Sequence, residues 1–377
     1  MICRIGAVAM VVLLTPSITL AAEKDDTAKV LEKYKPVVDN GLKWLVEQQH
    51  KDGHWEDKDG KFNVTITALA GLALLSEGST TKDGTYAEPL RKAVAWMLAC
   101  AQENGQLIDR TEKIKWPDYW QSMMNQGHGM FFLSQVYAKE ADEKSRKEIG
   151  KVLEKAIVCA QQNQTKSGGW GSVANDFDDG LSTQFMMLGM FACRKAGVAV
   201  PKELIESSLK YLRDRTSPVQ SQKAGIVYSL KTGGAPRPEL TAAAIALVLN
   251  AGEEKDTPTV LWLNYVESAE PFAKENLGTQ YGYDEFRQFV YAQACYQLGE
   301  ERDARLRPDR AKAENEQKEK IVLLKWSRHR EVMFARLKAT QWFKGFWRAG
   351  YFGDVYPSAV NLVILQLDKG NLPFCKR

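Results

Sequence analysis

The sequence predicts an all-α fold in which six helical hairpins follow one another and close into a ring. Aromatic residues recur next to glycine-containing turns with a period of about 58 residues, which is typical of a helical repeat. An amphipathic helical pattern precedes each turn, and a strongly apolar one follows it. Few stretches alternate with a period of two, so we expect few strands. The recurring aromatic residues are Trp55, Trp116, Trp170, Tyr228, Tyr283 and Trp347.

The first and third hairpins show the repeat most clearly. Each combines an amphipathic helix that ends in glutamines, a turn that contains glycine, and a tryptophan, Trp55 or Trp170. An apolar helix with a threonine near its start comes next. A hydroxyl residue stands at this place in four hairpins: Thr67, Thr183, Thr241 and Ser358.

The second and fifth hairpins are expected over residues 93–137 and 260–299, where the same order of patterns occurs. The sixth opens with a long charged stretch, residues 300–341, which we expect to form an exposed outer helix with many i,i+4 pairs. A coiled-coil or partner-binding arm is the alternative for this stretch. Glycines stand where helix C-caps are expected after the apolar patterns: Gly78, Gly197, Gly252, Gly299 and Gly370.

A ring places the apolar helices inside and the amphipathic helices outside. An open array of repeats needs polar terminal repeats, and the sequence shows none. Closure also allows residues 22–377 to form one domain of six repeats of about 58 residues each.

The N-terminus has the features of a secretory signal peptide over residues 1–21. A short basic segment, ten apolar residues (IGAVAMVVLL) and a small-residue cleavage site near Ala21-Ala22 follow one another. We therefore expect export to the periplasm or secretion, with no transmembrane segment after cleavage. An uncleaved membrane anchor is the alternative. The net charge of +4 contains no Lys/Arg block, which argues against a nucleic-acid partner.

Five scattered cysteines remain after removal of the signal peptide, and none belongs to a CxxC pair. Most lie in apolar helical patterns, so buried free thiols are expected. A disulfide between one pair stays open. The cysteines are Cys100, Cys159, Cys193, Cys295 and Cys375.

Four sequence motifs resemble those of the prenyltransferase and squalene-cyclase repeat superfamily, which includes terpenoid cyclases and protein prenyltransferase β subunits. They are QQHKDGHW (residues 48–55), GGW with the acidic loop after it (168–184), HGMFFLSQVY (128–137) and the C-terminal VYPSAVNLVILQLDKGNLPFCKR. The last two are similar to short exported bacterial members of planctomycete type. The resemblance covers about 330 residues and implies an α/α toroid, also called an α6/α6 barrel.

The resemblance implies terpene cyclisation as one alternative function. Asp176-Phe177-Asp178-Asp179 matches the D-x-D-D motif, whose middle aspartate protonates an alkene in those cyclases. Aligning Thr183 with the threonine that follows the motif in the family, however, puts Leu181 at the position of the proton donor. If the protein is an enzyme of this type, we expect acid chemistry at Asp178 or Asp179 with His128 nearby. A solvated acidic turn or a calcium-binding loop is the other interpretation.

A prenyltransferase-type zinc site is not expected. That site combines Asp, Cys and His, but no D-x-C precedes His128, and His50 and His54 flank the first turn instead. We therefore predict no metal and no cofactor.

A carbohydrate-active enzyme is a further alternative, because (α/α)6 toroids also carry glycosidases and lyases with paired carboxylates among aromatic residues. The candidate acids are Asp118, Asp284 and Asp354 together with Asp178, each expected at the start of an inner helix. Helix capping is the other role open to these aspartates.

The favoured hypothesis is a toroid of divergent or degenerate activity that binds an apolar small molecule, an isoprenoid, another lipid or a peptide, in a central cavity. Small and apolar residues of the inner helices would line this cavity: Ala68, Gly71, Met186, Gly189, Ala242 and Ala246. The predicted ligand residues are Met186, Gln184, Thr183, Asp118, Tyr283, Asp284 and Asp354.

Overall fold

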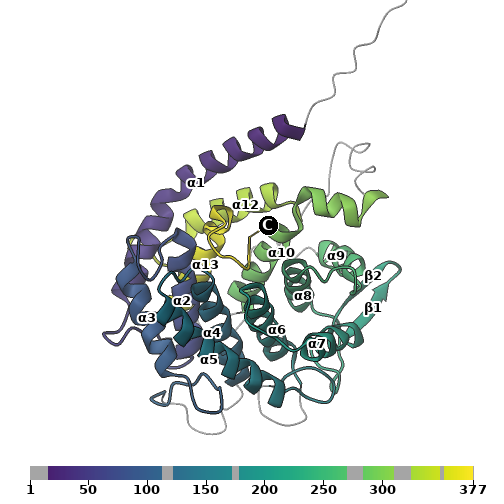
Figure 1. Cartoon of the computed structure of the whole chain (residues 1–377). Helices are drawn as coiled ribbons and strands as arrows, with labels where there is room; N and C mark the ends of the chain where they lie inside the picture. Colours follow the sequence, from purple (N-terminus) through teal and green to yellow (C-terminus); the bar gives the residue numbers. More distant parts are fainter. Residues whose placement is uncertain are drawn as a thin grey trace, which may run out of the picture.

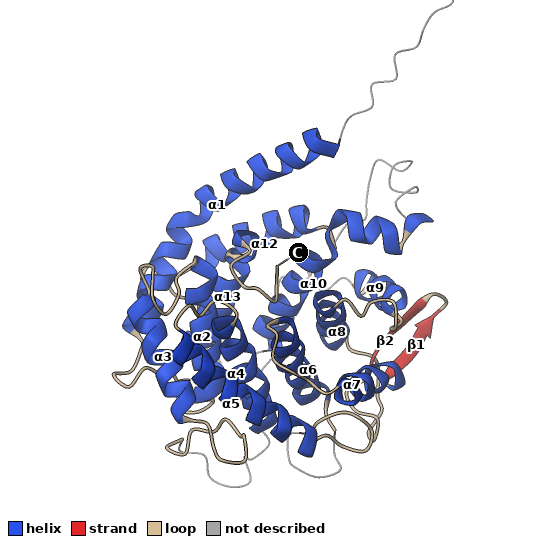
Figure 2. Ribbon diagram, viewed as in Figure 1, coloured by secondary structure: helices blue, strands red, loops and turns tan. Residues whose placement is uncertain are grey.

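The computed structural model describes residues 16–112, 122–171, 178–269, 283–309, 324–348 and 352–376. Within them, helices follow one another around a ring (Figures 1 and 2). Most of the predicted signal peptide, with Asp118, Asp176 and Trp116, lies outside the described residues, and helix α1 begins at Pro16. None of the described helices is both long enough and apolar enough to span a bilayer.

Six hairpins make up the ring, each with an outer helix followed by an inner one. The outer helices are α1 (Pro16–Glu47), α3 (Ala87–Ala99), α5 (Glu143–Gln162), α7 (Lys202–Asp214), α9 (Thr259–Ser268) and α12 (Trp326–Thr340). The inner helices are α2 (Asn63–Glu77), α4 (Ser122–Tyr137), α6 (Gly180–Lys195), α8 (Pro238–Ala251), α10 (Tyr283–Leu306) and α13 (Val355–Leu365). A short 3-10 helix, η2 (Leu367–Lys369), follows α13.

The ring closes because the last hairpin packs against the first. Each inner helix contacts the next, and α13 contacts α2 in turn. Gln366 Nε2 donates to the carbonyl of Ala73 at 3.1 Å, which joins the two inner helices across this seam. On the outside, Gln341 Nε2 donates to Val37 O at 2.8 Å. The predicted α/α toroid of helical hairpins is confirmed.

A five-residue turn links outer to inner helix with the same backbone in four hairpins, and we call it the rim turn. Its first N–H donates to the carbonyl of its fifth residue at 2.8–2.9 Å, and its fourth N–H donates back to the first carbonyl at 2.8–3.0 Å. The four rim turns are His50–His54, Gln102–Gln106, Thr165–Gly169 and Trp342–Phe346.

The fourth position of every rim turn is a glycine, at Gly53, Gly105, Gly168 and Gly345, with φ between 83° and 105°. A Cβ built at these glycines would lie only 2.1–2.4 Å from a backbone oxygen of the neighbouring outer helix. For the first turn this helix is α3, and for the last turn it is α1. Glycine is therefore required both for the left-handed conformation and for the close approach of the two backbones.

The tryptophan after three of the rim turns is held at both ends. Its indole N–H donates to a carbonyl ten residues earlier, at 2.7–2.8 Å for Trp55, Trp170 and Trp347. Its backbone N–H donates to the predicted hydroxyl residue of the inner helix, for example to Thr67 Oγ1 at 2.9 Å. These bonds explain why tryptophan and Thr/Ser recur together in the sequence.

Two of the predicted turn aromatics need correction. In the fourth hairpin, Ile226 rather than Tyr228 takes the place of tryptophan, because the Ile226 N–H donates to Thr241 Oγ1 at 2.9 Å. In the second hairpin this place belongs to Leu107, whose N–H donates to Gln126 Oε1 at 2.8 Å. Isoleucine and leucine fill the same buried position without an indole, so no aromatic residue marks this position in these two hairpins.

Among the described residues, the fourth hairpin also contains a two-stranded antiparallel sheet. Its strands are β1 (Thr216–Gln220) and β2 (Lys223–Ile226), with Thr216 opposite Ile226. The prediction that strands are scarce is confirmed. The charged stretch 300–341 is divided between the end of α10, which kinks at Gly299, and the outer helix α12, with residues 310–323 outside the described part.

The cysteine prediction is confirmed at four positions. Cys100, Cys159, Cys193 and Cys375 are buried and form no disulfide, and Cys295 is buried as well. Burial raises the pKa of Cys375 to about 12, so this thiol stays protonated at neutral pH.

The inner helices touch each other directly through their glycines. A Cβ on Gly71 would lie 2.3 Å from the ring of Phe132, and one on Gly127 would lie 2.3 Å from the carbonyl oxygen of Phe185. Met186 is fully buried in the same core. In this part of the ring, the small residues bring α2, α4 and α6 close together.

Candidate functional site

The four rim turns lie at the end of the ring where the inner helices begin. We call this end the rim. Three rim features combine polar and aromatic side chains: a surface groove, a pair of acidic residues and a buried histidine.

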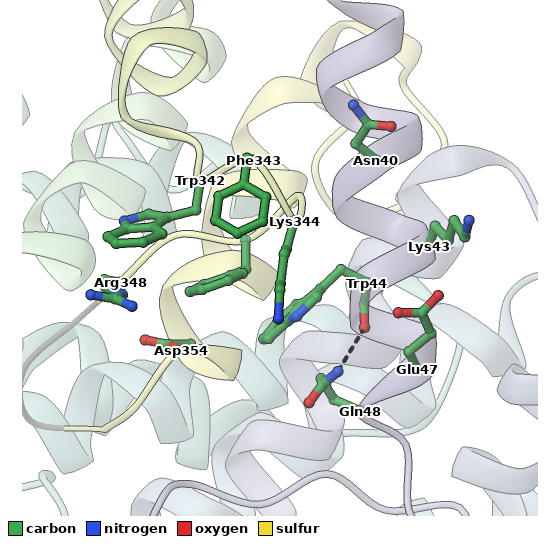
Figure 3. A pocket seen from close by; sticks show the side chains of 11 residues that line it. Asn40, Lys43, Trp44, Glu47, Gln48, Trp342, Phe343, Lys344, Arg348 and Asp354 are labelled. Carbon is green, nitrogen blue, oxygen red and sulfur yellow. Dashed lines mark hydrogen bonds between the residues drawn. The ribbon is translucent and has the colours of Figure 1, made fainter.

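The rim groove has a volume of about 750 Å³ and lies between α1 and the last rim turn (Figure 3). Phe346 stacks on Trp44 with a centroid distance of 4.9 Å and on Trp342 with 5.9 Å. The Arg348 guanidinium lies 3.4 Å from the centroid of the Trp342 ring. The full lining is Asn40, Lys43, Trp44, Glu47, Gln48, Trp342, Phe343, Lys344, Phe346, Arg348 and Asp354.

Two aromatic side chains of the groove are exposed to solvent. Trp342 is 38% exposed and Phe343 is 85% exposed, which is unusual for large apolar residues. Amide and carboxyl groups at and just after the end of α1 line the other side of the groove beside Trp44, among them Gln48, whose Nε2 donates to Trp44 O at 3.4 Å. The groove therefore offers flat apolar surfaces next to hydrogen-bonding groups.

A second cavity of about 690 Å³ adjoins the rim groove and shares Trp342 and Arg348 with it. It runs between α10, α12 and α13, where Glu285 and Gln288 face the last hairpin. Asn361 of α13 also lines it, and the buried Oδ1 of this side chain accepts no hydrogen bond from any described residue. An unsatisfied buried acceptor is costly, so a donor from solvent or a ligand would be favoured here.

Two acidic residues of the second hairpin, Asp109 and Glu112, accept hydrogen bonds from the first residue of α2. Glu112 Oε1 accepts from the Asn63 N–H at 2.7 Å, and Asp109 Oδ2 accepts from Asn63 Nδ2 at 2.7 Å. Burial, with the nearby Asp109 and Asp57 charges, raises the pKa of Glu112 to about 7 despite the hydrogen bond from the Asn63 backbone N–H. Glu112 can therefore hold or release a proton near neutral pH.

This acidic pair was not among the predicted residues, because the candidate acids were aspartates expected at the starts of inner helices. Asp109 and Glu112 instead follow Leu107 at the end of the second rim turn and reach across to another hairpin. The motif D-x-x-E directly after a rim turn was the available signal.

His128 lies on α4, buried between α2 and α6. Its Nδ1 donates to the carbonyl of Met124 at 2.9 Å, and its ring packs on Phe185 with a centroid distance of 4.0 Å. Burial lowers the pKa of His128 to about 4, so the imidazole is neutral at pH 7. With Nδ1 protonated, Nε2 is the basic nitrogen.

Asp178 turns toward the wall between the third and fourth hairpins. Its carboxylate accepts hydrogen bonds from Ser167 Oγ at 2.8 Å and from the Tyr211 hydroxyl, and Leu230 N–H lies 3.4 Å away. Tyr211 belongs to the outer helix α7. Asp178 thus links a rim turn, an outer helix and the loop before α8.

Asp179 is the N-cap of α6, since its Oδ1 accepts from the Ser182 N–H at 2.8 Å. Burial raises the pKa of Asp179, and the hydrogen bonds from Ser182 partly offset this effect. The contacts of His128 come from α2, α4 and α6, and no described hydrogen bond joins it to Asp178 or Asp179. Acid chemistry at these aspartates stays a prediction.

Among the predicted ligand residues, Met186 is buried in the core, and the others divide into three groups. Thr183 and Gln184 are used within the fold, because Thr183 Oγ1 bonds the Trp170 backbone and Gln184 Nε2 donates to Leu240 O at 2.6 Å. Asp354 lines the rim groove. Asp118 and the side chains of Tyr283 and Asp284 lie outside the described part.

Comparison with known proteins identifies the fold. No protein-family model matches the sequence, and no curated protein matches it either. Two solved structures of the GH76A α-1,6-mannanase from Salegentibacter sp. HEL1_6 match with TM-scores of 0.58 and 0.57, at 10% and 11% identity. The alignments cover 88% of this chain and 98% of the mannanase. The first is an inactive variant with two consecutive aspartates replaced by asparagine, in complex with α-1,6-mannotriose.

A protein from Actinoplanes matches with a TM-score of 0.52 at 14% identity, over 89% of this chain and 99% of that one. The type II terpene cyclase MstE from Scytonema aligns over 89% of this chain and 98% of its own, at 12% identity, with a TM-score of 0.35. At such identities the likeness to the mannanase and the Actinoplanes protein shows the α/α toroid and leaves the activity open.

Proposed function

We propose that this toroid binds an oligosaccharide at its rim, with the rim groove as the main subsite. The observation that carries the proposal is the exposed Trp342 ring, stacked on the buried Phe346, in a groove that is also lined by amide, carboxyl and guanidinium groups. A sugar ring has an apolar face that packs on an aromatic ring, and hydroxyls around its edge that need hydrogen-bonding partners. Aromatic surfaces with a few polar groups are also the usual lining of small-molecule sites.

The fold likeness supports the same class of ligand. The GH76A mannanase, an α/α toroid of similar extent, was solved with α-1,6-mannotriose. By analogy alone, a mannose-containing oligosaccharide is the first ligand to test here.

Glu112 and Asp109 are the proposed acid and base for cleavage of a glycosidic bond. Glycosidases use one protonated and one ionised carboxyl group, and a carboxyl with a pKa near the working pH is the better proton donor. Glu112, whose pKa is raised to about 7, would protonate the leaving oxygen, and Asp109 is the proposed base. The pair is linked to the last hairpin through Phe62, next to Asn63, whose ring packs on Phe352 with a centroid distance of 5.0 Å.

Titration with an oligosaccharide panel that includes α-1,6-mannotriose, followed by calorimetry, tests binding. We expect Trp342→Ala to weaken the affinity at least about tenfold, which is about 1.4 kcal/mol. Val332→Ala is the matched control, because Val332 is an exposed apolar residue of α12 that is absent from the groove lining. Unchanged affinity in Trp342→Ala would refute the groove as the subsite, and no binding of any saccharide would refute the proposed ligand class.

An apolar ligand, as favoured by the sequence, is the second candidate. The supporting observation is a row of rings on the inner helices, where Phe185 contacts His128 at 4.0 Å and Phe286 at 5.5 Å. Native mass spectrometry of the freshly purified protein would detect a retained lipid or isoprenoid, and its consistent absence would count against this candidate.

A further inference from the structure

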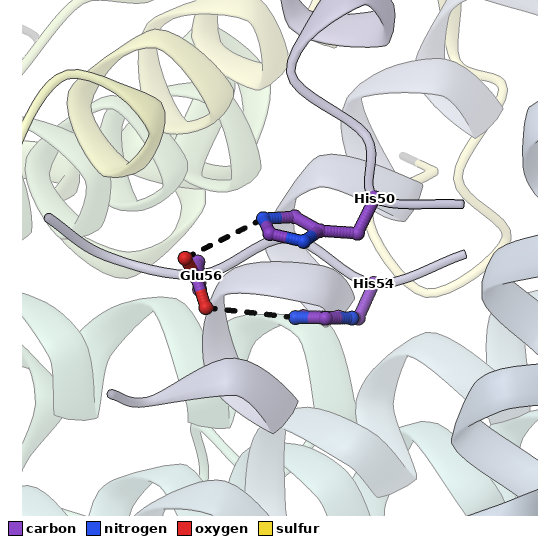
Figure 4. Close-up of side chains that lie close together, drawn as sticks. All are labelled: His50, His54 and Glu56. Atoms are coloured by element: carbon purple, nitrogen blue, oxygen red, sulfur yellow. Dashed lines mark ion pairs between the residues drawn. The ribbon is translucent and has the colours of Figure 1, made fainter. Parts of the chain in front are cut away.

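The first rim turn places two histidines at its two ends. The His50 N–H donates to the His54 carbonyl at 2.9 Å, so the backbone itself holds the two residues opposite each other. Their rings stack with a centroid distance of 4.3 Å and an interplanar angle of 24°. Glu56 follows two residues later and turns its carboxylate toward both rings (Figure 4).

The distances between the three side chains suit a small metal ion. Glu56 Oε1 lies 3.5 Å from His50 Nε2, and Glu56 Oε2 lies 3.7 Å from His54 Nε2. One ligand atom from each residue lies within 4.8 Å of the others. Tetrahedral zinc with bonds of about 2.0–2.1 Å needs ligand atoms about 3.3 Å apart. Small side-chain rotations would therefore bring the three groups to bonding distance.

Asp52, which is not one of the three proposed ligands, orients the imidazole of His54. Asp52 Oδ1 lies 2.6 Å from His54 Nδ1, which directs the lone pair of Nε2 toward Glu56. A carboxylate on the far nitrogen of a histidine is the usual support of a zinc ligand. The His54 ring is further held against Trp96, with centroids 5.3 Å apart.

The triad of His50, His54 and Glu56 is accessible to solvent on the side of His50. The His54 side chain is 12% exposed, whereas that of His50 is 44% exposed. A cavity of about 570 Å³ lies over the turn and shares Glu47 and Gln48 with the rim groove. Water or a ligand could thus complete a four-coordinate ion.

We propose that His50, His54 and Glu56 form a binding site for a divalent transition metal, with zinc as the first choice. Two imidazoles and one carboxylate favour zinc, copper or nickel over magnesium and calcium, which prefer oxygen ligands alone. The sequence predicted no metal because its histidines were compared with the zinc motif of prenyltransferases, whereas this site follows from the geometry of the rim turn.

The test is zinc titration of the full chain, purified without a histidine tag and stripped of metal, by calorimetry. We expect one equivalent of zinc to bind, and we expect His54→Ala and Glu56→Gln each to abolish this binding. Asp52→Asn should weaken it 10–100-fold, as is typical for an outer partner of a zinc ligand. Cobalt in place of zinc should give the intense visible absorption of a tetrahedral site.

Glu47→Gln is the matched control, since Glu47 is a carboxylate over the same turn that is not part of the triad. It should leave the zinc affinity unchanged. Circular dichroism of each variant separates loss of the site from loss of the fold, and Glu56→Gln removes only a charge. The proposal is wrong if the parent protein binds no zinc, or if His54→Ala and Glu56→Gln bind it as tightly as the parent.

Discussion

The first and last rim turns have the same backbone conformation but carry side chains of different chemical character. Both have the same pair of backbone hydrogen bonds and a glycine with positive φ at the fourth position. The positions that carry His50, His54 and Glu56 in the first turn carry Trp342, Phe346 and Arg348 in the last. In the first turn these side chains form a candidate metal site, and in the last they form an aromatic stack.

The two turns belong to neighbouring hairpins, because the ring closes between the last and the first. Their cavities share Glu47 and Gln48 at the end of α1. The repeat therefore fixes the positions of three side chains. The residue types at these positions determine what the surface can bind.

The largest expected effect tests whether the shared backbone depends on glycine. Gly53→Ala and Gly345→Ala should each lower the free energy of unfolding by about 3 kcal/mol or more, because the new Cβ meets a backbone oxygen at 2.4 Å. Gly197→Ala is the control, since Gly197 has a φ of +89° but nothing within 4 Å of its Cβ position. It should cost only about 1 kcal/mol. Urea unfolding measures all three, and equal losses would show that close approach is unimportant.

The first turns of α2 and α13 also differ. Glu112 accepts a hydrogen bond from the first N–H of α2, whereas Asp354 does not cap α13 through its side chain. A folded-state pKa of about 7, above the ordinary 4.5, means that the stability contributed by protonated Glu112 is present below pH 4.5 and is lost as the pH rises through 7. Glu112→Gln removes this loss, so the variant should gain about 2–3 kcal/mol over the parent between pH 5 and pH 8.

Chemical unfolding at both pH values checks the expected gain. A parallel pH dependence of the parent and Glu112→Gln would contradict it.

The hydrogen bonds of the two turns to their neighbouring outer helices should be equivalent. Gln49 Nε2 donates to Gly53 O and Pro89 O, both at 2.9 Å, and Gln341 Nε2 donates to Gly345 O at 2.9 Å and Val37 O at 2.8 Å. Replacing either glutamine with alanine should cost about 1–2 kcal/mol. Thermal unfolding of the two variants compares them directly. A much smaller loss for Gln341→Ala would mean that the seam between α12 and α1 is looser than an ordinary contact between hairpins.

The smallest expected effect concerns the residue after the tryptophan in each turn. Arg348→Met removes the cation over Trp342, and Glu56→Gln removes the carboxylate beside the histidines. Without metal, each should change the free energy of unfolding by less than about 1 kcal/mol, because both contacts are at the surface. Urea unfolding measures the change, and a larger loss in either variant would assign a structural role to that position.

The fold could be predicted because its requirements are local. Glycine at the fourth position of the rim turn, tryptophan two residues later and threonine on the inner helix each satisfy a specific backbone need, so they recur in the sequence. The prediction failed at Ile226 and Leu107, where burial alone defines the position and any large apolar residue suffices.

The candidate site could not be predicted in the same way. The rim groove combines residues 40–48 with residues 342–354, which only ring closure brings together. Asp109 and Glu112 act on a helix of another hairpin, so their partners are invisible in local patterns. Asp354 was identified because it precedes an inner helix, although its place in an aromatic groove was not foreseen.

Closure has a consequence for biosynthesis. Ala73 and Gln366, which join α2 to α13, are separated by 293 positions along the chain. During translation, one flank of α2 therefore stays uncovered until the last hairpin has left the ribosome. We expect the chain to fold as a single cooperative unit, and a circular permutant that opens elsewhere in the ring should retain the same architecture, since the last hairpin packs against the first.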